Sequence, residues 1–211
     1  MALSAEETRG FYAAWAARFA AEREALIALD GKVGDSDLGI TMSKGFAAAN
    51  EAVAALEGAS VSGQMKAAGA ALAKAAPSTM GTLMATGFLR GFKALESAER
   101  FGTAEAATFW RAFAEGVAQR GKAQLGDKTV LDVLDPIAGA LEGSDAGLAG
   151  ALDAAVEAAA KALEATKDMV AQHGKAAAFQ EKSRGLPDAG GTVALILVEV
   201  MRDVARAAEQ G

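Results

Sequence analysis

Three aspartates lie close together in a glycine-rich stretch, LDGKVGDSDLGITM, at residues 29–42. Asp30, Asp35 and Asp37 alternate there with glycines, and no proline intervenes. Because Gly leaves the backbone free and Asp bonds its own neighbours, this composition predicts a tight loop. Three carboxylates held that close repel one another unless a cation lies between them. Oxygen ligands without His or Cys favour Mg²⁺ or Ca²⁺ over zinc. The alternative interpretation is a solvated turn that caps the next helix.

Two further polar segments have residue types that could bind an anion. Ser78, Thr79 and Met80 follow a proline at the start of an expected helix. The free N–H groups and dipole of a helix start favour phosphate, although plain capping is the simpler interpretation of the two hydroxyl residues. The second segment, RGKAQLGDKT at residues 120–129, also precedes an expected helix. Its basic side chains suit phosphate or a solvated surface.

The elements that must position these segments are predicted to be helices. Hydrophobic residues make up 52% of the 211 residues, but aromatics only 6%, and there are three prolines. Much of the apolar content is Ala, the strongest helix former, which predicts an all-α fold. Spacing and caps place eight helices at about residues 4–27, 39–56, 62–76, 81–97, 103–119, 130–141, 147–172 and 192–207.

Charge and composition also exclude several classes of protein. A net charge of −6 disfavours nucleic acid as a partner. The absence of cysteine excludes disulfides, thiol chemistry and Cys-ligated metals. The first residues lack the features of a signal peptide, and no apolar run is long enough to span a membrane. We therefore expect a soluble cytoplasmic protein with a single domain over residues 1–211.

Alternate connections of this expected bundle carry the polar residues. In an up-and-down arrangement, the connections at about 28–39, 77–81, 121–129 and 173–191 fall at the same end and would converge on one mouth. Connections as long as 173–191 are usually functional, so we predict a lid there. It contains the only histidine, His173, for which we expect a surface or nucleotide-adjacent role over catalysis.

Taken together, four motifs resemble the nucleotide-binding L subunit of dihydroxyacetone kinase, also found as the C-terminal domain of single-chain dihydroxyacetone kinases. They are Asp30, GDSDLG at 34–39, RGKAQLGDKTVLDVLDP at 120–136 and PDAGGT at 187–192. The resemblance covers essentially the whole chain. It implies a DhaL-like barrel of about eight antiparallel helices, with a nucleotide, ATP or ADP, at one end.

The resemblance also implies roles for particular residues. Asp30, Asp35 and Asp37 would hold magnesium ions that bridge the nucleotide phosphates. The residues implied to contact the nucleotide are Leu38, Gly39, Ile40, Thr41, Ser78, Thr79 and Met80, with Gly121, Thr129 and Val130 on the base side, a basic Lys175, and Asp188 closing the site. Lys122, Lys128 or Lys175 could supply further positive charge.

Two departures from the family pattern stand out. Relatives often have a Gly-Gly-x-Ser-Gly turn for phosphate where this chain has Pro77-Ser78-Thr79-Met80-Gly81. The residue after Asp37 is often His or Cys and is Leu38 here. Both departures would suit a branch of the family acting on another small ketose.

The resemblance further implies a kinase that works as one subunit of a complex. A histidine on a separate K-type subunit would hold the ketose covalently, so this chain would have no catalytic residue of its own beyond the metal site. The surface around the four connections would dock that partner, with Leu38 and Met80 as apolar contacts. The donor could be free ATP, or bound ADP recharged by a phosphotransferase-system phosphoprotein.

Two rival functions remain open at this point. One is the nucleotide module of a fatty-acid kinase, a related helical domain that would need a lipid-binding partner. The other is a non-catalytic scaffold that binds a divalent metal. Nucleotide binding that requires magnesium would exclude the scaffold.

Overall fold

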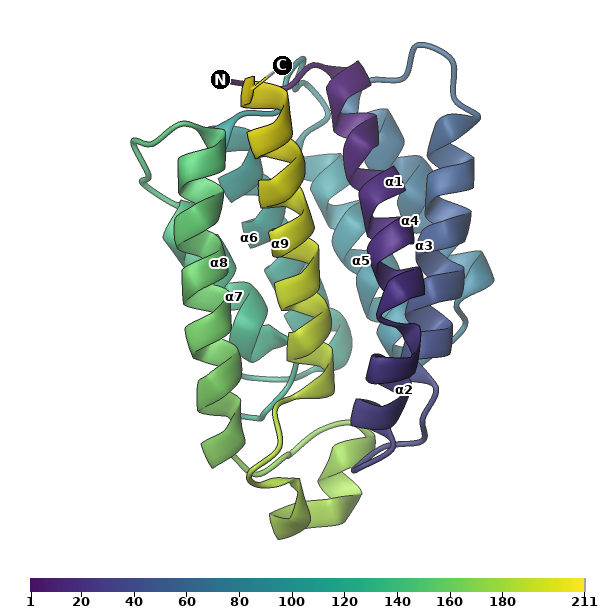
Figure 1. The fold of residues 1–211 in the computed structure, drawn as a ribbon, viewed down its shortest axis with the longest axis vertical. Coiled ribbons are helices and arrows are strands. Elements are labelled where there is room, and N and C mark those ends of the chain that lie inside the picture. The colour runs from purple at the N-terminus through teal and green to yellow at the C-terminus, as the bar shows by residue number, and fades with distance from the viewer. Residues whose placement is uncertain (211) are drawn as a thin grey trace.

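Nine α-helices and two 3-10 segments organise residues 1–210, the part of the chain that the computed structural model describes (Figure 1). The α-helices are α1 (Ala5–Ala21), α2 (Arg23–Asp30), α3 (Leu38–Ala54), α4 (Val61–Ala75), α5 (Thr79–Ala94), α6 (Thr103–Gly121), α7 (Leu131–Leu141), α8 (Leu148–Ala165) and α9 (Ala189–Gln210). The 3-10 segments are η1 (Thr166–Asp168) and η2 (Lys175–Ser183).

The helices form a closed ring. From α3 to α9 each long helix packs against the next, and α1 closes the ring by packing against both α9 and α3. Helix α2 continues the line of α1 (Figure 1). The predicted all-α barrel of antiparallel helices is confirmed. Within residues 1–210, no helix combines the length and apolarity needed to cross a bilayer.

Aromatic side chains fill the barrel between the helices. Trp15 of α1 packs edge-on against Phe46 of α3 and Phe88 of α5, with ring centroids 6.0 and 5.6 Å away. Its indole nitrogen donates to the carbonyl of Leu197, 3.0 Å away on α9, so one residue links four helices. Phe19 stacks on Phe46 with centroids 4.5 Å apart. The aromatic side chains of α1 therefore belong to the core.

Two glycines of α5 allow α6 to approach closely. A Cβ at Gly87 would lie 2.4 Å from the ring of Phe113, and a Cβ at Gly91 would lie 2.4 Å from the ring of Phe109. The sequence predicts close backbone approach to a helix or a ligand at these glycines. The structure shows that the neighbour is the aromatic face of α6, which offsets the low helix propensity of Gly.

Several helix boundaries differ from the predicted ones. The first helix is interrupted at Glu22, and α6 extends to Gly121. Helix α8 ends at Ala165 and continues into η1, where the Thr166 hydroxyl accepts the N–H of Asp188 at 2.9 Å. Residues 173–191 are not all loop: they contain η2 and the first turn of α9.

Candidate functional site

The polar connections meet at one end of the barrel, opposite the two termini (Figure 1). Three helix starts lie together around Gly190 of α9. A Cβ there would come within 2.7 Å of Met80 Cε on α5 and 3.1 Å of Val130 Cβ before α7. The connection between α8 and α9 reaches the aspartate loop, where the ammonium of Lys175 donates to the Asp35 carboxylate. All four predicted segments therefore contribute to one face.

The three aspartates converge. One carboxylate oxygen from each of Asp30, Asp35 and Asp37 lies within 4.8 Å of the other two. Asp30 Oδ2 accepts the N–H groups of Asp37 and Leu38 at 3.0 and 3.3 Å, so Asp30 caps α3. Asp37 occupies the N-cap position but its side chain makes no capping hydrogen bond. The loop therefore does more than cap a helix, since two carboxylates remain on its surface.

Glycine is required for the shape of this loop. A Cβ at Gly34 would lie 2.1 Å from Asp30 Oδ1, and one at Gly31 would lie 2.7 Å from the Ser36 hydroxyl oxygen. Ser36, between the two exposed aspartates, has a left-handed φ of 63°. Any larger residue at Gly34 would displace the Asp30 carboxylate, so the glycines hold the three acids together.

The electrostatics of the cluster suit a cation. Partial burial raises the pKa of Asp37, and the nearby charges of Asp35 and Asp30 raise it further, while Lys175 opposes the shift. The pKa of Lys175 is raised, first by its hydrogen bond to Asp35. Three oxygen donors with one exposed ammonium as their neutralising group match the ligand preference of Mg²⁺. The donor set and its spacing thus fit the predicted ion.

At the other helix starts of this face, side chains accept hydrogen bonds from the backbone. The Ser78 hydroxyl accepts the N–H of Gly81 at 3.1 Å, which confirms plain capping for this residue, and Thr79 is exposed. Asp132 Oδ2 accepts the N–H of Thr129 at 2.7 Å at the start of α7. Asp188 Oδ2 accepts the N–H of Gly191 at 2.6 Å in α9. Four helix N-termini, each carrying partial positive charge, therefore point toward one end.

Asp188 is the most strongly perturbed acid of this face. Burial raises its pKa to about 7, and the nearby charge of Asp132 adds to the shift. The N–H of Gly191 and the ammonium of Lys128 oppose it. Asp188 therefore titrates near neutral pH, in contact with the first turn of α9.

The residues after Asp37 are mostly inside the protein. Leu38, Gly39 and Thr41 are buried, and Ile40 is half-buried. A Cβ at Gly39 would lie 2.0 Å from the carbonyl oxygen of Arg23, so this glycine seats α3 against α2. Gly121, at the end of α6, faces Leu83 of α5, whose Cδ2 lies 3.6 Å from where its Cβ would be.

Two of the expectations for individual side chains are wrong. Leu38 is only 4% exposed, so it cannot serve as an apolar docking contact. The exposed large apolar residues of this end are instead Leu125, 60% exposed, and Phe179, 37% exposed. Lys128 does not offer its charge to the mouth, because its ammonium is buried and bonded to the carbonyls of Met169, Ser183 and Leu186.

Sequence reasoning did not identify the residues that fasten the loops. Asp132 lies three residues after Thr129, a capping-box spacing that could have revealed its role. Asp127 accepts the N–H of Gln124 at 2.7 Å and lies 3.1 Å from His173 Nε2. This contact places the only histidine in a loop-fastening position, at the half-exposed surface.

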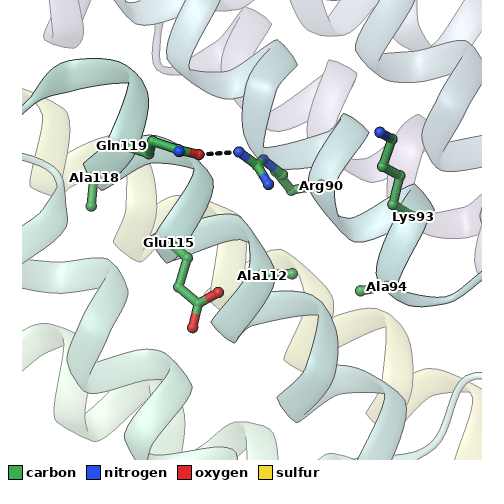
Figure 2. Close-up of a pocket in the computed structure, with 7 residues that line it drawn as sticks. All are labelled: Arg90, Lys93, Ala94, Ala112, Glu115, Ala118 and Gln119. Atoms are coloured by element: carbon green, nitrogen blue, oxygen red, sulfur yellow. Dashed lines mark hydrogen bonds between the residues drawn. The ribbon is translucent and has the colours of Figure 1, made fainter.

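A surface groove also runs between α5 and α6, away from the aspartate loop. Figure 2 shows its alanine floor and polar rim, with the Arg90 guanidinium donating to the Gln119 side chain. None of the predicted site residues lines it. The groove is therefore separate from the carboxylate cluster at the end of the barrel.

The fold and the site define a closed helical barrel with a carboxylate cluster at one end. A family model described as "DAK2 domain" matches residues 32–203, and the chain belongs to this family. Its sequence is 30% identical over 186 residues to the "PEP-dependent dihydroxyacetone kinase, ADP-binding subunit DhaL" of Escherichia coli K12, covering 87% of this chain and 89% of that protein. The corresponding subunit of Listeria innocua is 33% identical, with 85% and 86% covered.

Longer relatives and solved structures match as well. The "D-erythrulose kinase" of Mycolicibacterium smegmatis is 33% identical over 94% of this chain, which spans only 35% of that protein. The crystal structure of the dihydroxyacetone kinase of C. freundii in complex with AMP-PNP and Mg²⁺ superposes with a TM-score of 0.73 at 21% identity. The match covers 96% of this chain and 34% of the C. freundii chain, so this chain spans about a third of the length of that kinase.

Proposed function

We propose that this chain is the nucleotide-binding, phosphoryl-transfer subunit of a kinase for dihydroxyacetone or a related small ketose. The observation that carries the proposal is the convergence of Asp30, Asp35 and Asp37 within 4.8 Å at the end of a barrel of the DAK2 family. The relatives whose length it matches most fully are named as ADP-binding subunits, and a structural neighbour was solved with AMP-PNP and Mg²⁺.

The three aspartates would hold magnesium, which neutralises and orients nucleotide phosphates when bound. The chain's own contribution is positioning and charge, the main requirements of phosphoryl transfer. Asp30 is held by two backbone N–H groups, and Lys175 already lies against Asp35. The N-terminal turn of α5, with Thr79 exposed, offers donors to an anion.

The remaining predicted contacts would surround the nucleotide. Met80 and Val130 meet around Gly190, and Gly121 ends the neighbouring helix. We assign Val130, Gly121 and Thr129 to the base side of the nucleotide. Residues 38–41 and 78–80 would contact the rest of it. Asp188 would close the site from α9.

A K-type partner subunit would hold the ketose. The support is chemical: the chain has no cysteine, and His173, its single histidine, lies beside Asp127. The amine beside the aspartates, Lys175, is held as an ammonium by its hydrogen bond to Asp35, which raises its pKa, so it is a poor nucleophile for anchoring a ketose. Since a misplacement of about 1 Å can cost about 100-fold in rate, a small sugar at an open mouth needs a second surface to fix it.

Calorimetry of Mg-ADP binding tests the nucleotide and metal assignments. We expect binding by the wild-type chain, its loss on chelation of magnesium, and at least a roughly 100-fold weakening in Asp35→Asn and Asp37→Asn. Asp145→Asn, an exposed acid in the connection between α7 and α8, is the control and should bind normally. Unchanged affinity in folded Asp35→Asn and Asp37→Asn would disprove the metal assignment.

Activity assays test the division of labour and the phosphoryl donor. The isolated chain with Mg-ATP and dihydroxyacetone or erythrulose should show only background turnover, and a K-type subunit should restore it. Comparing ATP with a phosphotransferase-system phosphoprotein as donor then decides whether bound ADP is recharged. Robust ketose phosphorylation by the isolated chain would contradict the need for a partner.

A further inference from the structure

Lys128 is a buried lysine whose three ammonium protons all have main-chain acceptors. It is 2% exposed, and its Nζ donates to the carbonyls of Met169 at 3.2 Å, Ser183 at 2.6 Å and Leu186 at 2.8 Å. A lysine has three donors, so none is left for a phosphate. Its backbone has a left-handed φ of 57°, which turns the side chain inward from the start of α7.

The three acceptors come from both ends of the connection between α8 and α9. Met169 follows η1, Ser183 ends η2, and Leu186 precedes α9. One side chain therefore joins the part of this connection that leaves α8 to the part that returns to α9. The residue next to it acts in the same way, since the carbonyl of Asp127 accepts the N–H of Gln172 at 2.9 Å.

Ser183 also fastens the two ends of this connection to each other. Its hydroxyl accepts the N–H of Ala171 at 3.0 Å and donates to the carbonyl of Gln180 at 2.6 Å. The segment between these fastened points, residues 173–182, is the part that extends toward the aspartate loop. It carries Lys175, whose ammonium meets Asp35.

Holding both ends of a segment lowers the conformational entropy that its tip loses when it binds. If the connection were free, Lys175 at its tip would lose more conformational entropy each time it bound. A tip on a fastened connection is already placed. The contact between Lys175 and Asp35 is therefore expected to depend on the fastening at Lys128.

We propose that Lys128 is a positioning residue that holds the connection between α8 and α9 so that Lys175 reaches the aspartate cluster. The proposal rests on the proposed function, because its measured quantity is the affinity for magnesium nucleotide. It assigns Lys128 an indirect role, through Lys175, and gives it no contact with the nucleotide.

A double-mutant cycle between Lys128 and Lys175 tests this role. Mg-ADP affinity is measured for wild type, Lys128→Met, Lys175→Met and the double variant, with thermal unfolding recorded in parallel. We expect each single variant to bind roughly five- to tenfold more weakly. In the Lys128→Met background, Lys175→Met should have almost no further effect, since the tip is no longer placed.

The matched control is Lys93→Met, an exposed lysine of α5 that lines the groove away from the aspartate loop. It should bind as the wild type does. A role confined to stability would lower the unfolding temperature of Lys128→Met but leave the Lys175→Met effect at full size. Additive losses, or unchanged affinity in Lys128→Met, would therefore overturn the proposal.

Lys128→Met leaves three main-chain carbonyls without their donor and can prevent folding, so a milder variant is included. Ser183→Ala loosens the same connection and keeps the Lys128 ammonium with its three carbonyls, so it should show a smaller loss that is again non-additive with Lys175→Met. If Lys128→Met does not fold, additivity in the Ser183→Ala cycle overturns the proposal. Absence of Mg-ADP binding by the wild type would contradict the proposed function itself, which is a different outcome.

Discussion

Lys175 and Asp35, 140 positions apart in the sequence, meet at the open end of the barrel, where the lysine ammonium donates to the carboxylate. The side chain of Lys175 is 64% exposed, and that of Asp35 is 38% exposed. An ion pair so exposed adds little to folding stability. Its significance is positional: it places the one cation of η2 that touches the cluster beside a proposed metal ligand.

Replacing Lys175 should weaken nucleotide binding without weakening the fold. We expect Lys175→Met to lower Mg-ADP affinity roughly tenfold, about 1.4 kcal/mol, because the proposed charge-assisted contact to phosphate would be lost. Calorimetry measures the affinity, and urea unfolding measures the stability. Lys182→Met, an exposed lysine in the same 3-10 segment, is the control. Equal affinities for both variants would remove Lys175 from the site.

The connection between α8 and α9 should respond to nucleotide as a lid. Backbone amides of residues 173–182 are expected to exchange hydrogen more slowly when Mg-ADP is added. The reason is that Lys175 would then be held by the nucleotide as well as by Asp35. The amides around Ser183, where the connection is fastened, should be protected from exchange even without nucleotide. Hydrogen exchange measured by mass spectrometry distinguishes the two parts. Equal exchange of residues 173–182 with and without nucleotide would show that they form no lid.

Exposed apolar residues at the mouth should matter only when a partner is present. Leu125→Ser should raise the concentration of K-type subunit needed for half-maximal ketose phosphorylation, by roughly tenfold if Leu125 is a central contact. Phe179→Ser is expected to act in the same direction. Mg-ADP affinity of Leu125→Ser should stay unchanged. Leu89→Ser, 37% exposed on the wall of the barrel, is the control, and an equal effect there would argue against docking at the mouth.

The raised pKa of Asp188 should make the stability of the nucleotide-free protein depend on pH. Its pKa rises from 3.8 to about 7 because of burial, so the folded state favours the protonated form. The folded state then binds the proton more tightly than the unfolded chain. The contribution of Asp188 is therefore most favourable below about pH 4, and it is lost as the pH rises through about 7.

The variant Asp188→Asn stays neutral and should remove this dependence. At about pH 4 it should be close to the wild type in stability, whereas at pH 8 it should be more stable by roughly 2 kcal/mol, allowing for partial exposure. Urea unfolding at both pH values measures the difference. Asp145→Asn should show no such divergence. Parallel pH profiles for Asp188→Asn and wild type would mean that Asp188 is not perturbed.

Local patterns were sufficient to predict the aspartate loop. Asp30, Asp35 and Asp37 lie within eight residues, with Gly34 where only glycine fits, so composition and spacing specify a compact acidic turn. The helical barrel was equally accessible, because alanine content and helical spacing are properties of each segment by itself. The up-and-down arrangement predicted that the polar connections share one end, and the family resemblance added the barrel and the expected nucleotide.

Contacts between distant segments could not be predicted in this way. The carbonyl acceptors of Lys128 lie 41, 55 and 58 residues away, so nothing near Lys128 in the sequence distinguishes it from a surface lysine. Gly190 and Gly191 suggest a loop by propensity, yet they belong to α9. A Cβ at Gly191 would lie 2.7 Å from Val133, so packing of α9 on α7 decides their conformation.

The aromatic interior of the barrel also determines what tryptophan fluorescence can report about this protein. Its two tryptophans, Trp15 and Trp110, are 2% and 1% exposed and lie among phenylalanine rings, away from the loop of acids. Their ultraviolet emission should be blue-shifted in the native state and move to longer wavelength when the barrel opens. Because neither indole touches the mouth, nucleotide should leave the spectrum unchanged. Tryptophan fluorescence should thus report unfolding and not nucleotide binding. A nucleotide titration needs an added fluorescent dye or calorimetry.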